Sequence, residues 1–380
     1  MRDLLLGRKS PDIDLAVESH CHEVGKVLAR ELGGRFVYHA RFLSGTVLLA
    51  DGRHIDINQT RTECYQRPAV LPVVKPAPIE DDLGRRDFTI NAIALALAPR
   101  EPGRFLDPHC GRADVAQRTV RVLHDRSFTD DPTRIFRCIR FAVRYGFAVE
   151  PHTLDLMRAA IKDGCPKLLT PERILYELRL ICAEPRSLAM MEAVIRERLL
   201  LSAFDWTPPR GFLESLARLA QRRAGPGLLF IYLLSTLPVT DRFPIAKAER
   251  AAAAALRQAA AVRARVARVE RPSAVYRALH AVPEPALVIM SLLATGPTAT
   301  RIKRYLSELK DVRPLVGGAE LRVLGLRPGP LYRQVLDKLL FARLDGRIRT
   351  MSEELTLCRR LARRDIAGLS HNSARVPNPD

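Results

Sequence analysis

The sequence has 380 residues, of which 47% are hydrophobic and 27% charged, and this length predicts two or more domains. No apolar run reaches the roughly 18 residues that a membrane span needs, and the apolar stretch at the N-terminus is too short for a signal peptide. The seven cysteines are scattered without a C-x-x-C pair, which argues against a disulfide framework or a zinc site and favours reduced thiols in the cytoplasm.

The net charge of +19 is unevenly distributed along the chain. Residues 1–113 contain 16 Lys/Arg and 15 Asp/Glu, whereas residues 114–380 contain 45 and 27, so the first part is near neutral and the second carries +18. This asymmetry favours a polyanionic partner bound by the second part. The alternative is an arginine-rich genome whose basic residues only cover solvated faces. Few aromatic residues argue against base stacking as the main mode of binding.

The first part has the pattern of a mixed α/β domain. Strands are predicted at residues 12–17, 35–40, 45–50 and 54–58, with a helix at 22–34 that ends at two glycines and a hairpin turn at Asp51-Gly52. The proline-rich residues 67–82 predict an extended loop, and the apolar run 88–97 predicts a strand or a buried helix.

From about residue 114 the pattern becomes helical. Asp131 is a predicted N-cap with Pro132 in the first turn and Gly146 as the stop, and Thr170 with Pro171 repeats the design. Further helices are predicted at 246–270 and within 326–346, and residues 371–380 are predicted to be disordered.

The motif SPDIDLAV places two carboxylates on one face of the first strand. Because strand side chains alternate, Ile13, Leu15 and Val17 are expected to face a core, while Asp12 and Asp14 share the opposite face. Two like charges repel there, and a divalent cation such as Mg²⁺ would offset that repulsion. The alternative is a surface strand with two solvated aspartates.

Asp56 lies between Ile55 and Ile57 in HIDIN and should point away from both. Three carboxylates on adjacent strands could hold two Mg²⁺ ions, one activating an attacking hydroxyl and one binding a triphosphate. Arg86, beside Asp87 in LGRRDFTINAIA, would suit the triphosphate. A solvated strand edge and a paired surface bridge are the alternatives.

Arg134, Arg137 and Arg140 recur every three residues after Asp131 and form one stripe of a helix. A guanidinium beside a carboxylate can recognise a base edge through hydrogen bonds. Spacing alone fits a solvated face with a capping aspartate equally well.

Four ordered segments, RDLLLGRKSPDIDLAV, EDDLGRRDFTINAIAL, DDPTRIFRCIRFAVRYGF and PERILYELRLI, resemble the motifs of the bacterial class II tRNA nucleotidyltransferase and poly(A) polymerase family over residues 1–190. The resemblance implies an α+β fold, with a polymerase-β-like nucleotidyltransferase head domain followed by all-helical neck, body and tail domains. We place these domains at residues 1–113 (head), 114–185 (neck) and 186–370 (body and tail), with a disordered tail at 371–380.

The resemblance also assigns roles to residues. Asp12 and Asp14 match the metal-binding pair, and Asp56 matches the third catalytic carboxylate. The nucleotide-binding residues implied are Arg2 and Arg86 for the phosphates, Asp87 for the ribose, Asp131 and Arg134 for the base, and Arg137 and Arg140 as further contacts.

Two departures from the family pattern bear on these expectations. Asp130 stands where the family usually has Glu, and the first motif normally begins Gly-Gly-x-Val-Arg-Asp, whereas this chain begins Met1-Arg2-Asp3. We therefore expect a glycine turn and a further strand to be encoded upstream of Met1. The tail, with LGLRPGPLYRQVLDKLLFARLDG, resembles long multidomain members, some of which add only the terminal A.

The sequence thus predicts template-independent transfer of nucleotides from CTP and ATP to the tRNA 3′ end, as CCA or as the terminal A, with Mg²⁺ as cofactor and release of pyrophosphate. The alternatives are a poly(A) polymerase that tails general RNA and a catalytically impaired RNA-binding fragment. A nucleotidyltransferase for small molecules would share the paired aspartates but would not need the basic second part. We expect no membrane association, and the sequence does not indicate an oligomeric state.

Overall fold

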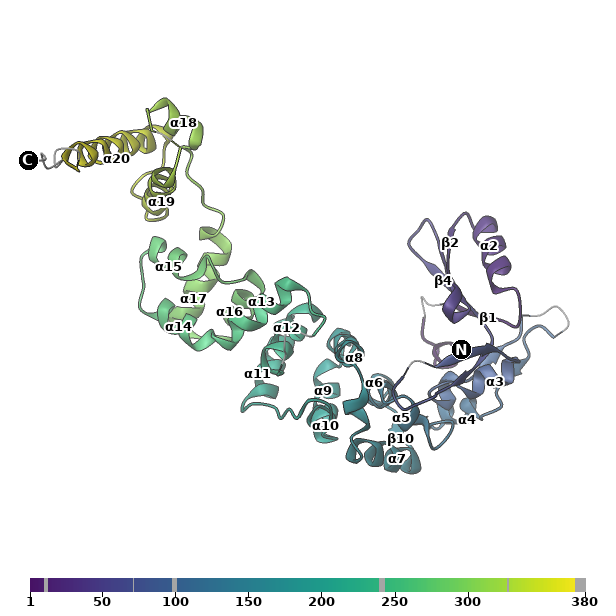
Figure 1. Cartoon of the computed structure of the whole chain (residues 1–380). Coiled ribbons are helices and arrows are strands. Elements are labelled where there is room, and N and C mark those ends of the chain that lie inside the picture. The colour runs from purple at the N-terminus through teal and green to yellow at the C-terminus, as the bar shows by residue number, and fades with distance from the viewer. Residues whose placement is uncertain (10–12, 71, 98–100, 239–242, 327, 373–380) are drawn as a thin grey trace, which may run out of the picture. The chain divides into compact units, whose positions relative to one another are not determined.

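The computed structural model describes the chain except for residues 10–12, 71, 98–100, 239–242, 327 and 373–380 (Figure 1). It divides into two compact units. The first comprises Met1–Leu213 with Thr240–Pro244, and the second comprises Glu214–Val239 with Ile245–Asp380. Among the described helices, none is both long and apolar enough to cross a membrane.

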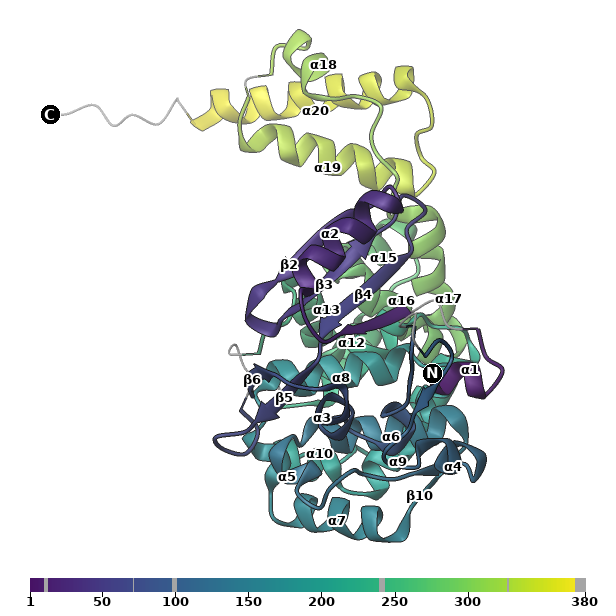
Figure 2. The same ribbon diagram turned by 90° about the vertical axis from the view of Figure 1, so that its right-hand side faces the viewer.

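A four-stranded sheet and one covering helix form the start of the first unit (Figure 2). The strands lie in the order β1-β4-β3-β2, with β1 parallel to β4 and the other pairs antiparallel. Helix α2 packs on one face, where Cys21 and Ala29 contact Val47, Ile55 and Ile57. The elements are β1 (Ile13–Val17), α2 (Cys21–Glu31), β2 (Arg35–His39), β3 (Ser44–Leu48) and β4 (His54–Gln59), preceded by α1 (Arg2–Leu5).

The alternation predicted for the first strand is confirmed at two of its three apolar positions. Leu15 and Val17 pack against the core under α2, but Ile13 is 48% exposed. The prediction that Ile13 faces the core was wrong because β1 lies at the edge of the sheet and Ile13 is its first described residue, so only β4 flanks it.

The segment after β4 is more ordered than the sequence predicted. The supposed extended loop at 67–82 contains a strand and a helix, and the apolar run at 88–97 is neither one strand nor one helix. The prolines of 67–82 suggested a loop because proline interrupts helices, but Pro76 ends the short strand β6, where proline is compatible with strand pairing. The elements are β5 (Arg61–Cys64), β6 (Val73–Pro76), α3 (Ile79–Gly84), the 3₁₀ turn η2 (Thr89–Asn91), β7 (Ala94–Leu95) and β8 (Phe105–Leu106).

The rest of the first unit is mainly helical, as predicted, with one pair of two-residue parallel strands, β9 and β10. Gly146 adopts φ +68° and ends α6, and Thr170 is the N-cap of α8. The N-cap of α6 is Pro132 and not Asp131, so the helix begins one residue later than predicted. The Asp131 carboxylate still accepts a hydrogen bond from the Thr133 N–H. The elements are α4 (Gly111–Ala116), β9 (Thr119–Val120), α5 (Ser127–Asp130), α6 (Thr133–Tyr145), β10 (Ala148–Val149), α7 (Pro151–Lys162), η3 (Cys165–Leu168), α8 (Pro171–Ala183), α9 (Ser187–Arg196) and α10 (Leu199–Phe204).

The second unit contains helices throughout its described residues. The helix predicted at 246–270 is two helices that meet at Gln258, and residues 371 and 372 belong to the last helix rather than to a disordered tail. The remaining tail residues lie outside the described part of the chain. The elements are α11 (Phe212–Gln221), α12 (Pro226–Thr236), α13 (Lys247–Arg257), α14 (Ala259–Ala267), α15 (Pro272–Leu279), α16 (Glu284–Leu293), α17 (Gly296–Arg304), the π-helix η4 (Tyr305–Leu309), α18 (Gly318–Val323), α19 (Pro330–Leu344) and α20 (Met351–Asn372).

Candidate active site

One pocket of about 680 Å³ in the first unit gathers most of the predicted site residues. They come from α1, from β1, from the turn after α3, and from α6 together with Asp131, which lies just before that helix. Eight of the ten predicted residues line it: Arg2, Asp14, Arg86, Asp87, Asp131, Arg134, Arg137 and Arg140. Asp56 lies on the neighbouring strand but is not part of the lining, and Asp12 lies outside the described residues.

Asp14 and Asp56 are paired in register across the parallel strands β1 and β4. Because neighbouring strands lie about 4.8 Å apart and register partners share a face, the two carboxylates lie side by side on the face opposite α2. The Thr46 hydroxyl donates a 2.6 Å hydrogen bond to Asp56 Oδ1 and so restrains that side chain.

The donor set of this strand pair suits a hard divalent cation, because carboxylate oxygens are its preferred ligands. Within the described residues, however, no three His, Cys, Asp or Glu side chains gather where they could hold a metal ion. The predicted site needs Asp12 as well, and that residue is not described.

Asp87 is buried and accepts three hydrogen bonds from neighbouring residues. Its Oδ1 accepts from the Phe88 N–H and from Asn91 Nδ2 (2.9 and 2.8 Å), and its Oδ2 accepts from Arg137 Nε (2.7 Å). Burial by itself would raise the pKa of Asp87, but the charge of Arg137 and these hydrogen bonds lower it below its usual value. Asp87 is therefore ionised and joins the turn after α3 to helix α6.

Asp131 and Arg134 line the same pocket but are held by different partners. Asp131 Oδ1 accepts from the Thr133 hydroxyl (2.6 Å) and from Arg173 Nη2 (2.7 Å). Arg134 is 5% exposed. Its Nη1 donates to the Ser127 hydroxyl (2.7 Å), and its Nη2 donates to the main-chain carbonyl oxygen of Arg85 (2.9 Å). Arg173 received no role from the sequence, although it belongs to the motif PERILYELRLI, which forms helix α8 and could have drawn attention to it.

Arg2 and Arg140 are held in different ways. The Arg2 guanidinium lies 4.5 Å from the centre of the Tyr145 ring, donates to Asp3 Oδ2 (2.8 Å) and also bonds Asn91. Arg140 Nη1 donates to Glu177 Oε2 (2.8 Å) inside the helical layer.

Three pocket arginines keep a buried N–H without a hydrogen-bond partner in the described structure, the Nε groups of Arg2, Arg86 and Arg140. A buried donor without a partner is costly. Eight arginines and five carboxylates line the pocket, so its net charge is positive. The site therefore suits a small polyanion.

Comparisons with known proteins agree with this chemistry. The family described as "Poly A polymerase head domain" matches residues 1–121. An A-adding tRNA nucleotidyltransferase of Halalkalibacterium halodurans is 30% identical over 94% of this chain and 86% of its own length. A CC-adding tRNA nucleotidyltransferase of Deinococcus radiodurans is 32% identical over 94% and 87%. The chain belongs to the tRNA nucleotidyltransferase family.

Solved structures of the family place the same fold on both parts of the chain. A CCA-adding enzyme in apo form II superposes with a TM-score of 0.78 and 30% identity, covering 93% of this chain and 88% of that one. A Thermotoga maritima CCA-adding enzyme complexed with tRNA gives a TM-score of 0.71 with 28% identity. The predicted fold class, a head domain followed by helical domains, is confirmed, whereas the predicted boundaries after residues 113 and 185 stay predictions.

Relatives in this nucleotidyltransferase family differ in length and in what their names say they add. An A-adding tRNA nucleotidyltransferase of Geobacter sulfurreducens is 32% identical over 95% of this chain, but the chain spans only 44% of that relative's length. An A-adding and a CC-adding relative are each 32% identical to this chain, so the percent identity does not distinguish between the two activities.

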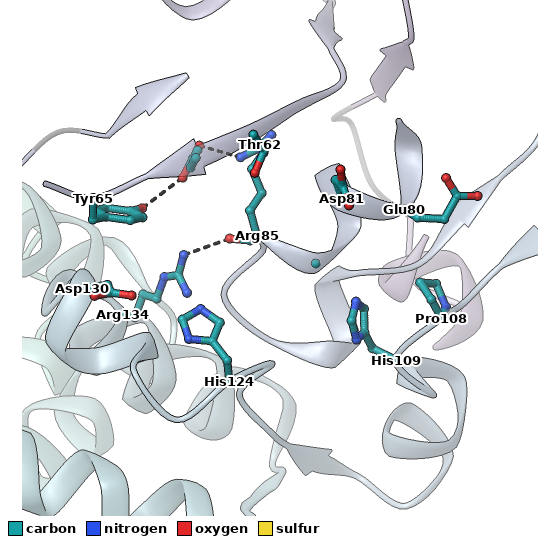
Figure 3. Close-up of a pocket in the computed structure, with 12 residues that line it drawn as sticks. Thr62, Tyr65, Glu80, Asp81, Arg85, Pro108, His109, His124, Asp130 and Arg134 are labelled. Atoms are coloured by element: carbon teal, nitrogen blue, oxygen red, sulfur yellow. Dashed lines mark hydrogen bonds and ion pairs between the residues drawn. The ribbon is translucent and has the colours of Figure 1, made fainter. Parts of the chain in front are cut away.

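A second pocket of about 440 Å³ adjoins the first (Figure 3). Both pockets are lined in part by Glu63, Tyr65, Arg85 and Arg134. His124 also lines the second pocket, and burial lowers the pKa of its imidazole. Arg134 and Tyr65 therefore form part of the wall between a cationic pocket and a pocket with histidines and carboxylates.

Proposed function

We propose that this chain transfers nucleotides from CTP and ATP, without a template, to the 3′ end of tRNA, as CCA or as the terminal A. The observation that carries the proposal is the single cationic pocket in which Asp14, Arg86 and Asp131 meet, because these residues suit the three parts of a metal-bound nucleoside triphosphate. The names of the relatives, A-adding and CC-adding tRNA nucleotidyltransferases, support the same reaction class.

In the proposed reaction the 3′ hydroxyl of the RNA attacks the α-phosphorus of the triphosphate. A phosphodiester bond forms, the bond to the β-phosphate breaks, and pyrophosphate leaves. Enzymes of this family generally use divalent metal ions, and we propose that Asp12, Asp14 and Asp56 hold Mg²⁺. Bound Mg²⁺ would activate the hydroxyl and neutralise phosphate charge.

The arginines and Asp87 hold the nucleotide in this proposal. Arg2 and Arg86, whose guanidinium groups belong to the lining of the pocket, bind the phosphates. Asp87, kept ionised by Arg137, accepts a hydrogen bond from the ribose. Arg137 and Arg140 make the cationic wall of the pocket.

Asp131 and Arg134 select the base in this proposal. An ionised aspartate only accepts hydrogen bonds and an arginine only donates them. Cytosine and adenine each present an amino group beside a ring-nitrogen acceptor, which complements this pair, whereas guanine and uracil present a carbonyl beside an N–H. Buried groups left without partners cost about 1–3 kcal/mol each, so GTP and UTP should be rejected roughly 10- to 100-fold per mismatch.

The basic residues of 114–380 are the proposed binding surface for the tRNA, in a cytoplasmic protein. Affinity for tRNA should fall steeply with added salt as counterions are released. If tRNA binding does not weaken with added salt, the basic residues of 114–380 do not form the binding surface, and their excess reflects only an arginine-rich genome.

The decisive experiment incubates the protein and Mg²⁺ with tRNAs that end before CCA, after C or after CC, and with each nucleoside triphosphate alone. Incorporation of C into the shortest tRNA supports CCA addition, and incorporation of A only after CC supports addition of the terminal A. Long homopolymer tails on unrelated RNA would instead support a poly(A) polymerase. Efficient use of GTP or UTP would contradict the assignment of Asp131 and Arg134.

A matched pair of variants tests the carboxylate assignment. Asp14→Asn should abolish incorporation and leave tRNA binding intact, because the proposed metal loses a ligand. Asp51→Asn removes an exposed carboxylate from the nearby turn that precedes β4, where it pairs with Arg53, and should leave incorporation unchanged. Near-normal incorporation by Asp14→Asn would rule out its role.

A further inference from the structure

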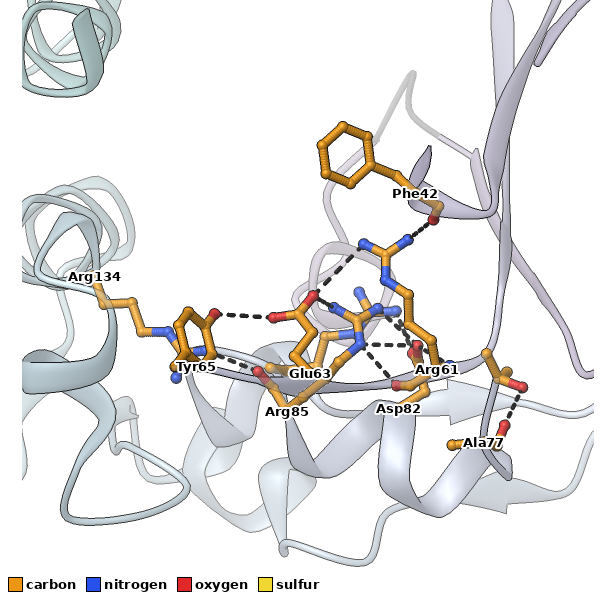
Figure 4. A network of polar contacts seen from close by, with 10 residues as sticks. Phe42, Arg61, Glu63, Tyr65, Ala77, Asp82, Arg85 and Arg134 are labelled. Atoms are coloured by element: carbon orange, nitrogen blue, oxygen red, sulfur yellow. Dashed lines mark hydrogen bonds and ion pairs between the residues drawn. The ribbon is translucent and has the colours of Figure 1, made fainter. Parts of the chain in front are cut away.

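A buried carboxylate next to the pocket, to which the proposed reaction gives no role, binds two consecutive arginines. Asp82 lies in α3 with 1% of its surface exposed. Its Oδ1 accepts from Arg85 Nη2 (2.7 Å) and Nε (3.1 Å), and from the Arg61 N–H (3.2 Å). Its Oδ2 accepts from Arg86 Nη2 (2.8 Å). One aspartate thus fixes the directions of both guanidinium groups, and Figure 4 shows Asp82 beside Arg85.

Asp82 is charged in the folded protein. Burial by itself would raise the pKa of this carboxyl, but the charges of Arg86 and Arg85 and their hydrogen bonds lower it below its usual value. Charge-assisted hydrogen bonds of this kind are about twice as strong as neutral ones. The arrangement therefore resists rotation of either arginine.

The second carboxylate of the network comes from strand β5. Glu63 Oε1 accepts from Arg85 Nη1 (2.8 Å), and Oε2 accepts from the Tyr65 hydroxyl (2.9 Å). Arg85 is therefore held from two sides, by Asp82 and by Glu63, and Figure 4 shows its side chain between them. A residue clamped in this way is a rigid support for whatever binds its main chain.

What binds the main chain of Arg85 is the proposed base-selecting arginine. Arg134 Nη2 donates to the Arg85 carbonyl oxygen (2.9 Å), and Arg134 is nearly buried. The adjacent residue, Arg86, is the proposed triphosphate contact and has a buried Nε without a partner. Asp82 is thus hydrogen-bonded directly to Arg86, the proposed phosphate contact. Through Arg85 it is also linked to Arg134, the proposed base contact.

We propose that Asp82 is a positioning residue that sets Arg86 for the triphosphate and, through Arg85, sets Arg134 for the base. The proposal rests on the proposed nucleotidyl transfer and goes beyond it, because it ties affinity for the triphosphate and choice of base to one buried carboxylate. A carboxylate with only a structural role would change stability but not the ratio in which the enzyme uses different bases.

The test is Asp82→Asn, which keeps the shape but places an amide N–H against one of the two arginines. With the tRNA held at saturation, KM for ATP should rise about tenfold, as expected for the loss of one charge-assisted hydrogen bond. The preference for ATP over GTP should fall by about the same factor, and kcat should change by less than about threefold.

Asp81→Asn is the matched control, since Asp81 is the neighbouring residue of the same helix and is exposed. It should leave KM, kcat and the ratio of ATP to GTP use unchanged. Asp82→Glu restores the charge and should recover part of the lost preference. If Asp82→Asn does not fold, as judged by circular dichroism, Glu63→Gln loosens Arg85 from the other side and should lower the same preference.

A double-mutant cycle decides whether Asp82 acts through Arg86. If it does, Asp82→Asn combined with Arg86→Gln should raise KM for ATP no further than Arg86→Gln alone. Fully additive effects, or an unchanged ratio of ATP to GTP use in every folded Asp82 and Glu63 variant, would overturn the inference. A wild-type protein that incorporates no nucleotide would instead refute the proposed function on which it rests.

Discussion

Removal of Glu177 should destabilise the first unit by an amount that the structure allows us to work out. Glu177 in α8 accepts a 2.8 Å hydrogen bond from Arg140 in α6, and the two side chains are 5% and 6% exposed. Glu177→Ala leaves a buried guanidinium without this partner, a change that typically costs about 3–5 kcal/mol. Glu184 lies 4.0 Å from Arg140 Nε and would still offset part of the charge, so we expect about 3 kcal/mol.

Urea unfolding of the full chain, followed by circular dichroism, measures this cost. The double variant Arg140→Met/Glu177→Leu should be destabilised by less than about 1 kcal/mol, because apolar side chains of similar volume can replace a buried ion pair. Glu101→Ala breaks the exposed pair with Arg104 in the same unit and should cost less than about 0.5 kcal/mol.

The pH dependence gives an independent check. Burial raises the pKa of Glu177 and outweighs the attraction of Arg140 and Arg137. A carboxyl with a raised folded pKa contributes stability that is present below its usual value and is lost as pH rises through the folded pKa. Wild type should therefore lose more stability than Glu177→Gln as pH rises above about 4.5.

The urea experiment provides the refuting result for the ion pair. If Glu177→Ala and Arg140→Met/Glu177→Leu lose the same free energy of unfolding, the cost does not come from an unpaired buried charge.

Three further predictions concern packing, a buried carboxylate and a titrating imidazole. Gly111→Ala would place Cβ 2.1 Å from the Thr89 carbonyl oxygen, so the backbone must shift and thermal unfolding should show a loss of about 1–3 kcal/mol. Glu354→Ala should cost the second unit about 3 kcal/mol in urea, because Arg343 and two main-chain N–H groups lose a fully buried acceptor; an unchanged midpoint contradicts this. Burial lowers the pKa of His124 below 6.5, so its NMR titration should fall below that value, and its contribution to stability should be lost as pH drops through the folded pKa.

The sequence by itself determined the elements whose signals are local. The alternation of Ile55, Asp56 and Ile57 predicted which face of β4 is buried, and the structure places both isoleucines under α2. Proline and glycine at the ends of apolar repeats predicted where α6 and α8 lie, because these residues act through the backbone of their own turn. The ordered motifs predicted the family, since their residue types and spacing are specific.

Tertiary structure alone decided which charged residues meet. Arg137 binds Asp87 across 50 positions and Arg140 binds Glu177 across 37. Asp82 and Arg86 are only four positions apart, but packing leaves Asp82 just 1% exposed. A periodic stripe predicts that arginines share a helix face, but not which carboxylate each one contacts. The energy of a buried charge depends on its partner and on the water excluded around it, and both are set only when distant segments pack together.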